Sequence, residues 1–460
     1  MATVTKRNGT YRITVSSGYD TSGKQIRRSI TWKPEPGMTK KQIEKELERQ
    51  KVLFEEQVRN GLYIGGNIKL SDFFELWVKK YAKEHLKPTT LKNYTDCMKR
   101  IAPALGHIQL NKLQPHHLLS FYENLAEEGI RGDTKYKSLK DIKSYMKKHK
   151  ITQQKICDKT GLSVGTVRSV ARGNNVNRST AEKISAALNI PFNSLFAPAD
   201  DNNKLSGATA LYYHRVISTM LTTAVYWQII PYNPCSRVKP PRAEKKEAKY
   251  LDELEAAELL ECLENEPLTY KTLFTLILYS GMRRGEACGL EWRDIDFKNG
   301  IIDINKASLY LSDRGIFDND TKTESSHRVI RLPESALQLL KEHKKEQAKE
   351  RLKIGDKWVN SGKVFTSWDG KPIHPDTVSG WFHDFVRRHN LPEITVHSLR
   401  HTNATLMIAN GTDIKTVSKR LGHANITTTG NIYTHAIKTA DERAAEALQD
   451  LFSNQKAKQA

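Results

Sequence analysis

The 460-residue sequence is poor in cysteine and contains no long apolar segment. Its five cysteines are scattered and form no CxxC pair, so neither a disulfide framework nor a zinc site is expected. The longest apolar run, Thr272 to Tyr279, has the length of a buried helix and is too short to span a membrane. The N-terminal residues lack the apolar core of a signal peptide, which predicts a cytoplasmic protein.

Acidic residues are outnumbered by basic ones. Lysine and arginine total 73 and aspartate and glutamate 52, so the formal net charge is +21. Such a surplus favours a polyanionic partner, either nucleic acid or an anionic membrane surface. The length suggests about three domains.

One C-terminal stretch, residues 397–435, gathers residue types that suit chemistry on phosphate. His397 and Arg400 lie three residues apart, so their side chains would share one face of a helix. His423 and Tyr433 follow after glycine-containing breaks that would fold short helices back around that face. Tyrosine can act as a covalent nucleophile, and neighbouring cations suit a negatively charged centre.

The order and spacing of H-x-L-R-H-T, L-G-H and T-T-x-x-x-Y-T-H resemble the C-terminal signature of the tyrosine recombinases, the lambda-type integrase family. The family has an upstream arginine in a G-[LM]-R-x-G-E motif, which matches GMRRGE at residues 281–286. It also has a lysine on a β-hairpin between the two arginines, which Lys322 and the following HRVIRLP fit. Each motif alone is weak, whereas five matches in the expected order favour membership.

The resemblance implies a catalytic set consisting of Arg283, Lys322, His397, Arg400, His423 and Tyr433, with Glu286 in support. The two arginines would bind the non-bridging oxygens, because guanidinium groups stay protonated and offer forked donors to phosphate. Glu286, one turn from Arg283, would hold that guanidinium in place.

The remaining roles follow from the same resemblance. Tyr433 would form a 3′-phosphotyrosine bond that keeps the energy for rejoining, so no cofactor and no metal are expected. A free phenol has a pKa of about 10, so His397 would assist its deprotonation, and His423 would hydrogen-bond the phosphate. Lys322 would be the general acid for the leaving 5′ oxygen.

Taken singly, these residues have ordinary explanations. Arg283 and Glu286 form the i,i+3 pair of many helix surfaces, and Tyr433 is one of 17 tyrosines. Two further cations, Lys306 and Arg328, lie near the hairpin lysine and leave the identity of the general acid open.

The first 33 residues alternate apolar and polar side chains around an Asn8-Gly9 turn, a pattern that predicts antiparallel strands. A helix from about residue 39 to 59 carries an apolar stripe that would cover one face of the sheet. This unit, residues 1–62, resembles the arm-type DNA-binding domain of phage and conjugative-transposon integrases, whose polar strand face enters a major groove. The candidate DNA contacts on that face are Arg12, Arg27 and Arg28. A solvated basic face is the alternative.

From residue 67 the pattern becomes helical, with predicted helix starts at Pro88 and Pro115. Residues 67–132 and 204–240 together resemble the family's core-binding domain, a helical module that closes over one side of the duplex. Lys92 is a candidate phosphate contact, and an ordinary surface charge is the alternative.

The segment between these two parts, residues 135–200, has helix-turn-helix spacing and resembles the lambda-repressor/Cro-like DNA-binding domains. Gln153 would open one short helix, Gly161 would end it, and Ser163 would cap the next. The start of this recognition helix, where base edges are read, would contain Ser163, Val164, Thr166, Val167 and Arg168. A packing module or a protein contact is the alternative.

The last part, residues 248–460, follows a Pro-rich, charged linker and resembles the family's catalytic domain. Predicted helices cover residues 252–264, 268–279, 334–351 and 439–451, others begin at Pro375 and His397, and predicted strands cover 301–304 and 328–332. The last helix would pack on its own domain or dock on a neighbouring protomer. The predicted fold class is multidomain and mainly α: a small three-stranded β-sheet plus helix, a helical core-binding domain interrupted by a helix-turn-helix insertion, and an α+β catalytic domain.

The resemblance implies a site-specific recombinase, an integrase that integrates or excises a mobile element such as a phage or transposon. Its partners would be double-stranded DNA at core and arm attachment sites, a homodimer partner on each core site, a homotetramer at synapsis, and excision or host DNA-bending factors; it would act at the bacterial nucleoid. Two other classes stay open: a relaxing type IB-like topoisomerase, and a DNA-binding transcriptional regulator with an inactive recombinase domain. The arm unit and the insertion favour defined DNA sites over the topoisomerase, and the intact motifs argue against a relic.

Overall fold

The computed structural model describes residues 2–19, 22–59, 68–127, 135–199, 204–244, 248–320 and 327–432. The chain separates into two units, residues 1–245 and 246–460. Both are mainly helical with small antiparallel sheets, as predicted. No described helix is long and apolar enough to cross a membrane.

The N-terminal sheet has the order β1-β2-β3, with β1 at Thr3–Arg7, β2 at Thr10–Tyr19 and β3 at Gln25–Trp32. The turn between β1 and β2 places Asn8 and Gly9 at φ +46° and +74°, the left-handed conformation that a tight hairpin requires. Helix α1, Lys40–Arg59, packs on the sheet, and the shared core contains Ile13, Val15, Phe54 and Val58. These predicted elements are confirmed.

A second core joins two stretches of chain that are far apart in the sequence. Its helices are α2 (Leu70–Trp77), a π-helical turn (Val78–Ala82), α3 (Lys83–His85), α4 (Pro88–Leu105), α5 (Pro115–Ala126) and α11 (Gly207–Tyr226), with 3₁₀ turns at Leu110–Lys112 and Pro234–Arg237. Trp77 of α2 is fully buried and donates its indole N–H to Thr223 of α11 at 3.0 Å. The segment between α5 and α11 therefore interrupts the chain but not this core.

That segment forms a core of its own. Its helices are α6 (Ile142–Lys148), α7 (Gln153–Thr160), α8 (Val164–Ala171), α9 (Arg178–Leu188) and α10 (Phe192–Leu195). A sheet of order β5-β4-β6 accompanies them, with β4 at Lys135–Ser138, β5 at Val176–Asn177 and β6 at Phe196–Pro198. The sheet was not predicted, because such short strands carry too little periodic pattern. Since β4 pairs with β6, the first and last strands of the insertion lie side by side.

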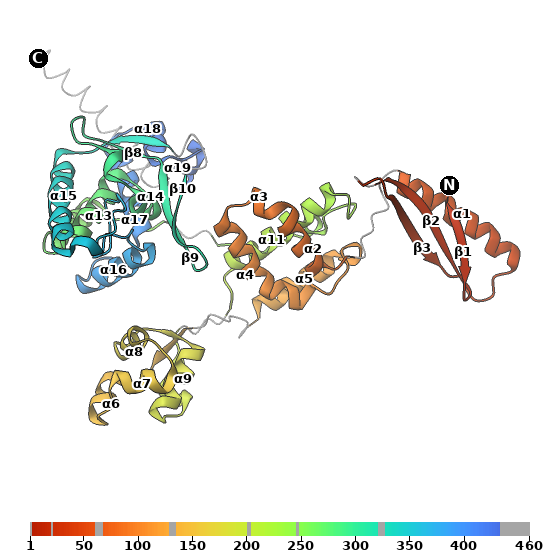
Figure 1. Ribbon diagram of the computed structural model, residues 1–460, viewed down its shortest axis with the longest axis horizontal. Helices are drawn as coiled ribbons and strands as arrows, with labels where there is room; N and C mark the ends of the chain where they lie inside the picture. Colours follow the sequence, from red (N-terminus) through yellow and green to blue (C-terminus); the bar gives the residue numbers. More distant parts are fainter. Residues whose placement is uncertain are drawn as a thin grey trace, which may run out of the picture. The chain divides into compact units, whose positions relative to one another are not determined.

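The second unit contains α12 (Glu253–Glu264), α13 (Leu268–Ser280), α14 (Arg284–Gly289), α15 (Glu334–Ile354), α16 (Pro375–Arg388), α17 (Val396–Ala409), α18 (Ile414–Leu421) and α19 (Ile426–Ile432), with 3₁₀ turns at Trp292–Asp294 and Gly355–Lys357. Helix α13 is buried along most of its length and packs against α12, α15 and α17, so it lies at the centre of this unit (Figure 1). The helices predicted up to His397 are confirmed; the one predicted at 439–451 lies outside the described residues.

The strands of this unit form two small antiparallel sheets. One has the order β11-β8-β7, with β11 at Arg328–Arg331, β8 at Ile301–Ile304 and β7 at Ile295–Asp296. The other is a hairpin of β9 (Lys306–Leu311) and β10 (Gly315–Asp320). Strands β8 and β11 match the prediction, whereas no strands were predicted at β9 and β10, although the resemblance implied a β-hairpin carrying Lys322.

Candidate active site

Helix α17 carries the first pair of predicted catalytic residues. Its N-terminus is fixed by a capping box between Thr395 and Ser398, which places His397 in the first turn and Arg400 one turn later. His397 is exposed to solvent, whereas Arg400 is only 1% exposed. The predicted pair thus combines an accessible imidazole with a buried cation.

The buried guanidinium of Arg400 is held by two main-chain carbonyls. Its Nη1 donates to the oxygen of Gly281 and its Nη2 to that of Leu421, both at 2.7 Å. Gly281 ends α13 in the left-handed conformation at φ +66°, and a Cβ there would meet a Leu421 methyl at 2.7 Å. The first glycine of the GMRRGE motif is therefore required by backbone conformation and by close packing.

Arg283 lies at the N-terminus of α14 and is bound to Glu286. Its Nη1 donates to Glu286 Oε1 at 2.7 Å, and its main-chain N–H donates to Oε2 at 2.9 Å. The Arg283 side chain is 40% exposed and that of Glu286 only 4%. This is a cation presented to solvent on a buried anionic support, unlike an exposed surface pair.

The C-terminal end of α18 brings three arginines together. Its last carbonyls have no partner within the helix and carry the negative end of the helix dipole, so they attract cations. The oxygens of Arg420, Leu421 and Gly422 accept from Arg328 Nε at 2.7 Å, Arg400 Nη2 at 2.7 Å and Arg283 Nη2 at 3.5 Å, respectively. One helix end therefore positions both arginines of the predicted catalytic set.

His423 follows directly after these carbonyls. Its Nδ1 lies 2.9 Å from the buried Thr429 hydroxyl of α19, and its main-chain N–H donates to Ser418 at 3.0 Å. Burial and the positive charges of Arg400 and Arg283 lower the pKa of His423 to about 4. Partial enclosure by the surrounding protein and the same two arginine charges lower the pKa of His397, although the residue is exposed to solvent. Both imidazoles are therefore neutral at neutral pH and can accept a hydrogen bond or a proton.

A third histidine belongs to this group and was not predicted. The His401 ring lies edge-on to that of His397, with ring centroids 4.6 Å apart. Burial, followed by His397 and Arg400, lowers its pKa to about 4. Its position four residues after His397, on the same helix face, was visible in the sequence.

Two members of the predicted set, Lys322 and Tyr433, lie outside the described residues. The alternatives to Lys322 are both engaged by acidic groups: Lys306 Nζ lies 3.0 Å from Glu291, and Arg328 Nη2 lies 2.7 Å from Glu286. Arg328 is a functional candidate that sequence reasoning left undecided. Strand alternation places it on the buried face of β11 with Ile330, and a buried arginine implies a partner.

The arm unit divides the three predicted arginines. Arg12 and Arg27 are exposed; Arg12 donates to the Ser29 hydroxyl at 3.1 Å, and Arg27 to Gln25 at 2.9 Å. Arg28 was wrongly assigned to this face. It pairs across the sheet with Val15 and is half-buried on the face that α1 covers, because side chains alternate along β3.

The insertion presents most of its predicted residues to solvent. Ser163 caps α8 as predicted, with its hydroxyl accepting from the Thr166 N–H at 3.2 Å, and Arg168 is exposed. Val167 was wrongly included among the base-reading positions, because it is 2% exposed and packs in the core of the insertion. In the core-binding stretch, Lys92 is exposed and lies 3.4 Å from Asp96.

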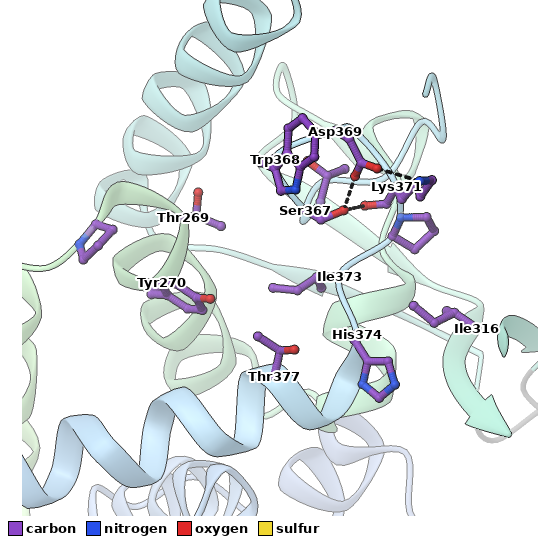
Figure 2. Close-up of a pocket in the computed structure, with 13 residues that line it drawn as sticks. Thr269, Tyr270, Ile316, Ser367, Trp368, Asp369, Lys371, Ile373, His374 and Thr377 are labelled. Atoms are coloured by element: carbon purple, nitrogen blue, oxygen red, sulfur yellow. Dashed lines mark hydrogen bonds and ion pairs between the residues drawn. The ribbon is translucent and has the colours of Figure 1, made fainter. Parts of the chain in front are cut away.

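An open pocket of about 760 Å³ lies elsewhere on the second unit, between the start of α13, the start of α16 and residues 366–373 (Figure 2). Tyr270, Trp368 and His374 contribute its rings. None of the described members of the predicted catalytic set lines it. This pocket is therefore separate from the arginine and histidine group.

Three family models match the chain. They are the phage integrase family at residues 249–440, the N-terminal SAM-like domain of phage integrases at 69–126, and the helix-turn-helix at 142–195. The chain also resembles a "Tyrosine recombinase XerC-like" protein of Caldanaerobacter subterraneus subsp. tengcongensis, with 28% identity over 96% of each chain. A "Tyrosine recombinase" of Thermosipho africanus is 31% identical over 48% of this chain and 67% of the relative.

A likeness of fold accompanies these matches. The Tn1549 transposon integrase, solved in complex with transposon right end DNA, superposes with a TM-score of 0.55 at 18% identity. The superposition covers 83% of this chain and 99% of that one. The chain belongs to the phage integrase family of tyrosine site-specific recombinases and carries an additional helix-turn-helix domain.

Proposed function

We propose that the protein is the integrase of a mobile element, which cuts and rejoins double-stranded DNA with Tyr433 as nucleophile. The observation that carries the proposal is the set of catalytic cations organised by the end of α18, with His423 next to them and His397 on α17. Arg283 is accessible, so its guanidinium meets the phosphate at the surface. Arg400 is buried, so its positive charge acts on the phosphate through the protein interior, where the low dielectric constant screens it weakly.

The proposed reaction needs no external energy source. The Tyr433 oxygen attacks the phosphorus, the bond from phosphorus to the 5′ oxygen breaks, and the 3′ end remains attached as a phosphotyrosine. His397 takes the phenol proton, which its lowered pKa permits at neutral pH because the ring is unprotonated. Lys322 gives a proton to the leaving 5′ oxygen. Rejoining reverses these steps with the 5′ hydroxyl of another strand as nucleophile.

The domain division predicted from the sequence is part of the proposal. The separate cores of residues 2–59, of the two core-binding stretches and of the insertion support boundaries close to the predicted ones. In recombination two duplexes and four active sites meet, so we propose a dimer on each core site and a tetramer at synapsis. The substrate places the protein at the nucleoid, with arm sites, excision factors and host bending factors as further partners.

The insertion is proposed to bind DNA through α8. Residues 135–199 contain 13 lysines and arginines against three acidic residues, so this seventh of the chain supplies a surplus of ten positive charges, about half of the total. Such a surplus supplies the non-specific part of DNA affinity. Ser163, Thr166 and Arg168 at the start of α8 are the proposed base-reading residues, with Arg12 and Arg27 proposed for arm sites and Lys92 for core phosphates.

The test of the nucleophile traps covalent protein–DNA complexes in cells and sequences the attached 3′ ends. The native protein is compared with Tyr433→Phe and with Tyr226→Phe, a control at a 79% exposed tyrosine of α11. We expect adducts at one or two discrete sequences from the native and control proteins, and none from Tyr433→Phe.

Other outcomes identify the alternatives. Adducts that survive Tyr433→Phe would mean that another tyrosine attacks. Native adducts scattered over the genome would indicate a relaxing topoisomerase. Binding without any adduct would indicate a regulator with an inactive recombinase domain.

The insertion has its own test, because its first and last strands are paired. Replacing residues 135–199 by a short Gly/Ser linker should leave the core-binding fold intact. We expect loss of occupancy at sites that native protein binds without forming adducts, such as its own promoter. Unchanged occupancy would refute DNA binding by α8.

A further inference from the structure

Arg328 is a buried cation with two well-formed contacts near the candidate active site. Its Nη2 donates to Glu286 Oε2 and its Nε to the oxygen of Arg420, both at 2.7 Å. Its side chain is 6% exposed, compared with 40% for Arg283. A guanidinium in this position is occupied by the protein and is poorly placed to bind DNA.

The first contact joins Arg328 to Arg283 through one carboxylate. Glu286 accepts from Arg328 on Oε2, from Arg283 Nη1 on Oε1, and from the Arg283 main-chain N–H on Oε2. Burial raises the pKa of Glu286, but the hydrogen bond and charge of Arg328, aided by Arg283, outweigh burial and bring it below its ordinary value. Arg328 therefore keeps the support of Arg283 ionised in a buried position.

The second contact fixes the end of α18. Arg328 on β11 binds the Arg420 carbonyl, and in return Arg420 Nη2 donates to the carbonyls of Arg331 on β11 at 3.2 Å and of Tyr279 on α13 at 2.9 Å. The following carbonyls receive Arg400 and Arg283, and His423 comes next in the chain. A displacement of the α18 end would therefore take a hydrogen-bond acceptor from Arg400 and from Arg283 and would shift His423.

We propose that Arg328 is a positioning residue for recombination, holding Glu286 and the end of α18 so that Arg283 and His423 meet the scissile phosphate with the buried charge of Arg400 behind them. The inference rests on the proposed function. It assigns Arg328 no contact with DNA and no proton transfer. It also explains why the strand following the predicted lysine segment begins with a buried arginine rather than an apolar residue.

The test uses the full-length protein and a nicked duplex carrying the sequence recovered from native adducts. Arg328→Met and Arg328→Lys are compared with Arg331→Met, a matched control on the same strand whose side chain is exposed. Binding is measured by fluorescence anisotropy and cleavage by the single-turnover rate of adduct formation. We expect Arg328→Met to lose roughly tenfold to a hundredfold in cleavage with binding changed less than about twofold, Arg328→Lys to be intermediate, and the control to match native protein.

A pH–rate profile separates positioning from a loss of fold. In Arg328→Met the buried Glu286 keeps only Arg283 as a partner, so the pKa of Glu286 should rise. Glu286 should then become protonated as the pH falls, and the variant should lose activity in a pH range where the native protein does not. The double variant Arg328→Met/Glu286→Gln should not show this additional loss of activity at low pH, because it no longer contains the group that titrates. If Arg328 only stabilised the fold, no loss of activity at low pH would depend on Glu286.

Several results would overturn the inference. Cleavage by Arg328→Met equal to that of the control would do so, as would binding that falls in parallel with cleavage, which would make Arg328 a DNA contact. If Arg328→Met does not fold, the charge-retaining Arg328→Lys decides: a native rate and profile would refute the role of the forked hydrogen bonds. Failure of the native protein to form any adduct would instead refute the proposed function.

Discussion

Gly281→Ala is expected to destabilise the second unit by a predictable amount. Gly281 has φ +66°, and a Cβ there would lie 2.7 Å from Leu421 Cδ2 and 2.8 Å from Asn403 Oδ1. The left-handed conformation costs alanine about 1–2 kcal/mol, and overpacking adds about 1–3 kcal/mol. The total is roughly 2–5 kcal/mol, and because Arg400 binds the Gly281 carbonyl, cleavage should fall as well.

Gly411→Ala provides the matched control. Gly411 also follows a helix in the left-handed conformation, at φ +81°, but a Cβ there would meet nothing within 4 Å. It should lose only the conformational part, about 1–2 kcal/mol. Hydrogen exchange of α13 and α17 peptides measures both variants, with α8 peptides as an internal reference. Equal losses in the two variants would refute the argument that close packing at Gly281 matters.

Three further predictions concern separate parts of the chain. Glu286→Gln should destabilise the second unit by about 3 kcal/mol, because the substitution leaves the buried Arg328 without a counter-charge. Urea titration followed by hydrogen exchange at α14 would measure the loss of stability. A loss below about 1 kcal/mol would contradict the buried pairing. Ser163→Ala should destabilise the insertion by about 1 kcal/mol, because α8 loses its N-terminal cap. The protection of α13 against hydrogen exchange should stay native, and a loss of protection in both helices would show that the two units unfold together. The pKa values of His401 and His423 are about 4 against an ordinary 6.5, so the folded state binds fewer protons than the unfolded state. The stability that these two groups contribute is present above about pH 6.5 and should be lost as the pH falls toward 4. Thermal unfolding at several pH values would measure this loss, and His423→Gln should show a weaker pH dependence than the native protein.

Local signals predicted much of the fold. The Asn8-Gly9 turn, Pro88 at the first turn of α4 and the Ser163 cap each specify an element end through their own chemistry, and each is found where expected. Strands β9 and β10 were missed in part because one of the contacts that hold them comes from far along the chain. Asp318 is held by the Ser308 hydroxyl at 2.5 Å and by Lys363, 45 residues away, also at 2.5 Å.

The candidate site was predicted as a set of residue types but not as an arrangement. Spacing placed His397 and Arg400 on one helix face, and the motif placed Arg283 beside Glu286. The sequence could not show that the last carbonyls of α18 bind both arginines, because every residue has a main-chain carbonyl and the sequence does not mark which ones accept. Arg328 was visible only as a charge in a strand, and its role needed the buried contact with Glu286.

The pairing of β4 with β6 has a consequence for how the core-binding module assembles. Its α5 and α11 are separated by about 80 residues, and closing an unstructured loop of that length opposes folding through chain entropy. If the insertion folds first, its paired ends leave about 16 residues of chain between them and the two helices, which lowers the entropic cost of loop closure by ~1.5 kcal/mol. The insertion would then act as a clip that speeds formation of the core around it. A variant whose β4–β6 pairing is broken should refold this module more slowly even where its native contacts are untouched.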